Sequence, residues 1–184
     1  MGGSFLAGWF ALFVALGAGL LSKHILPFRA PATDERLGSS LATLRGADES
    51  GWLAVHVLYE DCRCSVLVAE HLANTRRDKA WSEVVLWVGK DVPPALGSRF
   101  DVRRVSSVEL SRFGIEAAPI LVALDPKNHV HYAGGYTERK QGPVIDERRL
   151  MQQARANDYV EPLPVYGCAV SARLREESSL LPTL

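Results

Sequence analysis

The sequence predicts an α/β domain with a central mixed sheet flanked by helices, preceded by one N-terminal transmembrane helix. Two observations lead to this fold class. An uncharged apolar run occupies residues 4–21, and the rest of the chain alternates short apolar runs, typical of buried strands, with helical patterns. The 184 residues are enough for an anchor and one domain, but few for two separate cores.

The apolar run would rise about 27 Å as a helix, close to the roughly 30 Å of a hydrocarbon core. A cleaved signal peptide is the competing interpretation. However, no lysine or arginine precedes the run, and no clear small-x-small cleavage site precedes Lys23. We therefore expect an uncleaved anchor and a single-pass membrane protein. Lysine plus arginine and aspartate plus glutamate both number 21, which indicates no nucleic-acid partner.

Periodicity and turn residues predict the elements that follow the anchor. Residues 89–97 contain two adjacent prolines and are expected to form a loop. The expected elements, in chain order, are a helix at 33–45, strand 52–59, helix 66–79, strand 84–88, helix 107–113, a hairpin of strands 120–124 and 129–134, and a final helix at 144–157.

Cys62 and Cys64 lie between the first expected strand and the helix after it, and Pro119 directly precedes strand 120–124. With these residues and this element order, the block 52–157 resembles the thioredoxin-like superfamily. There, reactive cysteines open the helix after the first core strand, beside a cis-proline. The resemblance implies that Cys62, Cys64 and Pro119 are the site residues and that the Ala118–Pro119 bond is cis. This chain differs from the usual redox motif of the superfamily, which has two residues between the cysteines, because only Arg63 separates Cys62 from Cys64.

The apolar run and the resemblance together divide the chain into four parts. We expect a transmembrane anchor at 1–22, a linker and first helix at 23–46, a thioredoxin-like domain at 47–160, and a C-terminal extension at 161–184 that carries Cys168. Lys23 and Arg29 after the anchor favour a cytoplasmic domain by the positive-inside rule. Membrane-tethered domains of thioredoxin type commonly face the side where disulfides persist. We therefore expect a periplasmic or extracytoplasmic domain, with the membrane itself as one partner.

A helix N-terminus stabilises a thiolate, and Arg63 adds positive charge, whereas Asp61 opposes ionisation. The leading hypothesis is thiol–disulfide exchange that requires no cofactor. Cys62, taken as the exposed thiol, attacks a substrate disulfide and Cys64 resolves the mixed disulfide. The partners would be protein thiols or disulfides and a redox partner. The small ring of a Cys62–Cys64 disulfide predicts strain, which favours oxidising or isomerising chemistry.

Cys168 provides an alternative, because three sulfurs could supply most of a zinc, copper or iron–sulfur shell. The chain resembles bacterial thioredoxin-like membrane proteins with a second Cys-x-Cys pair near the C-terminus. Val170 stands where the second cysteine of that pair would fall, so the fourth ligand is missing. His71 lies about 10.5 Å along the helix from Cys64, too far for shared ligation.

Plainer interpretations remain for each of these residues. The cysteines could be inert thiols in a non-catalytic interaction domain, which is a third functional hypothesis. The remaining candidates fit ordinary structural roles, as surface or half-buried histidines and as packing tryptophans; they are His71, His129, His131, Trp52, Trp81 and Trp87.

Overall fold

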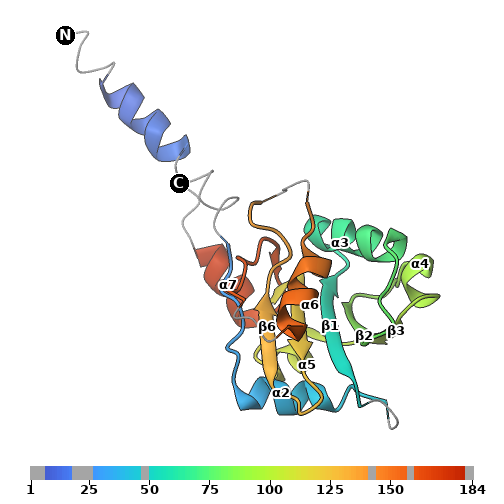
Figure 1. Ribbon diagram of the computed structural model, residues 1–184. Coiled ribbons are helices and arrows are strands. Elements are labelled where there is room, and N and C mark those ends of the chain that lie inside the picture. The colour runs from blue at the N-terminus through green and yellow to red at the C-terminus, as the bar shows by residue number, and fades with distance from the viewer. Residues whose placement is uncertain (1–6, 18–26, 47–49, 141–143, 157–159, 181–184) are drawn as a thin grey trace.

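A five-stranded mixed sheet forms the centre of the computed structural model, which describes residues 7–17, 27–46, 50–140, 144–156 and 160–180. The strand order is β3-β2-β1-β5-β6, with β1 in the middle (Figure 1). β1 pairs in parallel with β2, which pairs in parallel with β3, whereas β5 and β6 run antiparallel. The strands are β1 Trp52–Tyr59, β2 Trp81–Val88, β3 Asp101–Arg104, β5 Ile120–Leu124 and β6 Val130–Gly134.

Helices cover both faces of this sheet, so the domain has three layers (Figure 1). Alternate residues of β1 point to opposite faces, and its buried residues, 53–58, are apolar on both faces except for His56. Leu53, Val55 and Val57 pack toward α2 and α5, and Ala54 and Leu58 pack toward α3, α4 and α6. The helices are α2 Glu35–Ala42, α3 Arg63–Asn74, α4 Pro94–Gly97, α5 Ser107–Arg112, α6 Glu147–Arg155 and α7 Ala172–Leu180.

A second, two-stranded sheet lies next to the end of β1. It consists of β4 Ala117–Ala118 and β7 Cys168–Ala169, which run antiparallel with Cys168 opposite Ala118. The peptide bond between Ala118 and Pro119 is cis, as the resemblance implies. The chain therefore brings its C-terminal segment beside the residue that precedes this proline.

The described part of the N-terminal helix covers residues 7–17 and rises about 16 Å, roughly half of what a hydrocarbon core requires. Among the residues that the structure describes, no helix is both long and apolar enough to cross a membrane. The predicted fold class, which included a transmembrane helix, is therefore wrong, and so is the predicted single-pass membrane protein with a periplasmic domain. Residues 4–6 and 18–21 of the apolar run lie outside the described residues.

Candidate functional site

Cys62 is the residue that caps the N-terminus of α3. Its backbone is extended, with φ −107° and ψ 110°, and helical geometry begins at Arg63. The side chain is fully buried and its Sγ lies 3.5 Å from the carbonyl oxygen of Ala118. The strand-to-helix junction and the segment before Pro119 thus meet at this sulfur.

Cys64 lies in the first turn of α3 and is half-buried. It lines a small, mostly apolar pocket together with Pro119, Tyr136 and Tyr166, among other residues. Because Cys62 is buried and Cys64 faces this pocket, Cys64 is the accessible sulfur of the pair. The expectation that Cys62 is the exposed member was wrong. The physical reason is that α3 begins at Arg63 and not at residue 66, so that Cys62 occupies the capping position and points inward.

Cys168 reaches the same place from the other end of the chain. Its backbone pairs with Ala118, whose carbonyl oxygen is the one that Cys62 contacts. Gly167 permits this approach, because a Cβ atom at that position would lie 1.8 Å from the Ala118 carbonyl oxygen. The structure therefore brings Cys62, Cys64, Cys168 and Pro119 together.

The three thiols affect each other's ionisation. Interactions with Cys168 and then Cys64 lower the pKa of Cys62 far below that of an ordinary thiol, although burial opposes this. The pKa values of Cys64 and Cys168 are raised well above the ordinary range, in both cases chiefly by their interaction with Cys62. The cluster thus favours a single thiolate, centred on Cys62, because a second negative charge beside the first is costly.

Ser65 adds a polar group to this cluster. Its hydroxyl is fully buried and has no hydrogen-bond partner, a costly arrangement for an oxygen that can donate. The amide and hydroxyl of Ser65 both lower the pKa of Cys62. The hydroxyl is therefore placed to donate to the thiolate form.

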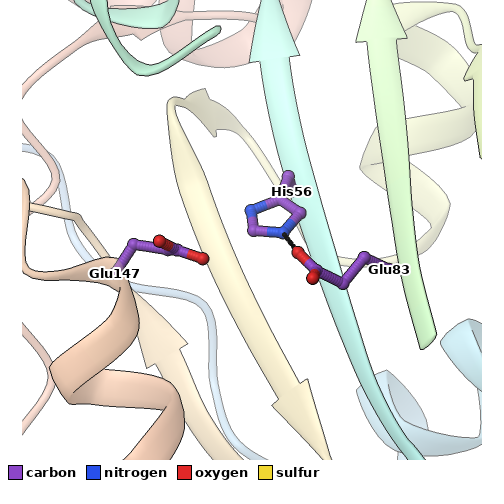
Figure 2. Close-up of side chains that lie close together, drawn as sticks. All are labelled: His56, Glu83 and Glu147. Carbon is purple, nitrogen blue, oxygen red and sulfur yellow. Dashed lines mark hydrogen bonds and ion pairs between the residues drawn. The ribbon is translucent and has the colours of Figure 1, made fainter. Parts of the chain in front are cut away.

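A second cluster of titratable side chains lies on the sheet face that α3 and α6 cover. Figure 2 shows His56 of β1, Glu83 of β2 and Glu147, the first residue of α6, pointing toward one another. His56 Nε2 lies 3.0 Å from Glu83 Oε2, and its Nδ1 lies 2.8 Å from the hydroxyl of Tyr136. Of the described residues, only these three form a group of potential metal ligands whose donor atoms all lie within 4.8 Å of one another.

Arg77 makes this second cluster a network of ion pairs. Its guanidinium pairs with both Glu83 and Glu147. Burial raises the pKa of Glu83, but His56 and Arg77 outweigh this and hold the pKa below its usual value. A divalent ion would have to bind beside a cation that already contacts both carboxylates. The group therefore acts as a buried ion-pair network that connects β1, β2, α6 and the segment that follows α3.

The described residues do not support metal binding by the three cysteines. Their sulfur atoms do not form a group in which all donor atoms lie within 4.8 Å of one another. The predicted zinc, copper or iron–sulfur shell of Cys62, Cys64 and Cys168 stays a prediction. His71, considered as a substitute ligand, instead contacts Glu147, with Nε2 3.5 Å from Oε2.

The remaining candidate residues have structural roles, as partners in ion pairs or in core packing. His129 and His131 both contact Asp125, at 3.0 and 3.4 Å. Trp81 and Trp87 belong to the core, and Trp52 packs on Trp81 with 5.2 Å between ring centroids.

Comparisons with known proteins show a similar fold and nothing about activity. No family model and no curated protein matches the chain. A hypothetical protein from Sinorhizobium meliloti 1021 matches with a TM-score of 0.54 and 18% identity, covering 66% of this chain and 79% of its own. An uncharacterized conserved protein from Geobacillus kaustophilus matches with a TM-score of 0.52 and 15% identity, covering 66% and 77%. At these identities the likeness concerns the fold alone.

Proposed function

We propose that this protein is a thioredoxin-like protein that carries out thiol–disulfide exchange, with Cys64 as the accessible thiol and Cys62 as its buried partner. One observation carries the proposal: Cys62 and Cys64 open α3 directly beside the cis-proline, and a third thiol lies against them. A thiolate at a helix N-terminus is the species that attacks disulfides. The substrate class is a protein or small-molecule disulfide that reaches the pocket at Cys64.

The exchange follows from the shared ionisation of the cluster. Cys64 passes its proton to the Cys62 thiolate and attacks one sulfur of a substrate disulfide. A mixed disulfide with Cys64 forms, the substrate S–S bond breaks, and the leaving substrate thiolate takes the proton from Cys62 and departs as a thiol. Cys62, again a thiolate, attacks the Cys64 sulfur, and the second substrate sulfur leaves as a thiolate that takes a proton from solvent. The two cysteines are oxidised by two electrons and the substrate disulfide is reduced by two.

A redox titration tests the proposal. The full chain is equilibrated without oxygen in glutathione buffers of graded ratio, and free thiols are counted by alkylation and mass measurement. We expect two of the three thiols to be lost reversibly over a defined range of glutathione ratios. Three free thiols at every ratio would overturn the proposal.

The ionisation of Cys62 gives a pH-dependent prediction. Because its pKa in the folded chain is depressed, the thiolate persists at pH values where an ordinary thiol, of pKa about 8.5, is protonated. Thiolate ultraviolet absorbance should therefore remain at neutral pH and disappear only as the pH falls through the depressed pKa. Urea-unfolded protein and the Cys62→Ser variant are the controls, and both should gain absorbance only in the alkaline range. The same alkaline titration in the folded wild type would contradict the prediction.

A further inference from the structure

The spacing of Cys62 and Cys64 makes a disulfide between them awkward. Cys64 is part of the first helical turn, and Cys62 is the extended residue that caps it. Only Arg63 separates the two cysteines, so their disulfide would close a small ring, and the bond requires distortion of that turn. Strained disulfides are more readily reduced and exchanged than relaxed ones.

A disulfide between Cys62 and Cys168 would not require this distortion of the helix. Cys168 is held by β7, far along the chain from α3, and its position depends on the pairing with Ala118 and the close approach at Gly167. Cys62 Sγ lies 3.5 Å from the carbonyl oxygen of Ala118, and its side chain interacts with those of both Cys168 and Cys64. Cys62 is therefore the sulfur that both other thiols can reach.

Building on the proposed exchange activity, we propose that Cys168 is a third redox residue that takes the disulfide over from Cys64, so that Cys62–Cys168 is the stable oxidised form. The Cys168 sulfur attacks Cys62 in the Cys62–Cys64 disulfide. A Cys62–Cys168 bond forms, Cys64 leaves as a thiolate, and the proton of Cys168 passes to it. The step is an exchange without net oxidation, so it needs no further oxidant beyond the substrate disulfide.

The takeover returns the accessible thiol to its reduced state. Cys64 again faces the pocket beside Pro119 and Tyr166, while the oxidising equivalent is stored between the buried Cys62 and the half-buried Cys168, neither of which lines that pocket.

Disulfide mapping of the full chain tests the takeover. The protein is oxidised in glutathione buffer, alkylated at acidic pH, digested and analysed by mass spectrometry. We expect a Cys62–Cys168 linkage in the wild type, with Cys64 alkylated. A dominant Cys62–Cys64 or Cys64–Cys168 linkage would overturn the takeover but leave the exchange activity standing. No reversible disulfide at all would instead defeat the proposed function.

Two variants sharpen this test. Cys168→Ser should accumulate Cys62–Cys64, and this bond should be reduced at about tenfold lower reduced glutathione than the wild-type disulfide. Gly167→Ala keeps the thiol but pushes it away from Ala118, so it should shift the linkage in the same direction. Gly97→Ala is the control, because a Cβ there meets no atom within 4 Å. An unchanged wild-type linkage in Gly167→Ala, with native circular dichroism, would contradict the positioning argument.

Discussion

Replacing Cys64 by serine is expected to abolish turnover of disulfide substrates, lowering the rate by several orders of magnitude. A serine hydroxyl ionises far less readily than a thiol and cannot form a mixed disulfide. Cys62 does not replace it, because its side chain has no exposed surface. The measurement is steady-state reduction of a small aromatic disulfide by the full chain with a thiol reductant.

The matched control for this variant is Val66→Ser. Val66 lies on the same helix and is exposed, so this change introduces the same hydroxyl without touching a sulfur. Its rate should stay within about twofold of the wild type, since surface substitutions away from special features are mild. If Cys64→Ser kept the wild-type rate and Cys62→Ser lost it, Cys62 would be the attacking thiol and the assignment would be reversed.

Replacing Arg77 by methionine is expected to destabilise the domain by about 3–5 kcal/mol, the cost of leaving buried charges without their partner. Glu147 is fully buried and Glu83 nearly so, and both lose the guanidinium. Methionine keeps an apolar stem, which limits the change in packing to the loss of charge and of the contact with Phe100. Urea unfolding of the full chain, followed by tryptophan fluorescence, provides the measurement.

Arg76→Met is the control, because Arg76 is the exposed neighbour of Arg77. Its free energy of unfolding should change by less than about 0.5 kcal/mol. Adding Glu83→Gln and Glu147→Gln to Arg77→Met should recover part of the loss, since neutral amides remove the unpaired charges. A loss below about 1 kcal/mol for Arg77→Met alone would mean that water or rearrangement replaces the ion pairs.

The central strands could be predicted from the sequence because local pattern alone determines them. β1 and β5 have the predicted bounds, since each is an apolar run, broken in β1 only by His56, that ends at acidic or turn residues. Five elements were missed from the sequence: β3, α4, β4, β7 and α7. α4 starts at Pro94, a residue favourable in a first helical turn that we interpreted as a loop residue. β4 and β7 have two residues each and exist only through their pairing.

The candidate site could be located from the sequence, but its geometry could not. The junction position of the cysteines and the return of Cys168 follow from element order, whereas burial of Cys62 depends on where the helix begins. No cap residue with a side-chain oxygen marks that start, so the predicted helix began three residues late. One residue could have indicated the ion-pair network from the sequence. His56 lies within an otherwise apolar strand, and a polar residue that must be buried there needs a polar partner.

The strand order has a consequence for association between molecules. β3 and β6 are the outer strands, and an open strand edge invites pairing with another chain. β3 is only four residues long and carries Asp101, Arg103 and Arg104, so a second chain would gain few backbone hydrogen bonds and would meet charge. At the end of β6, the amide of Gly135 donates to the carbonyl oxygen of Leu163 at 2.9 Å. β3 is therefore protected by its short length and its charges, and the end of β6 by the segment at Leu163 that crosses it. Both features protect this sheet against edge-to-edge aggregation.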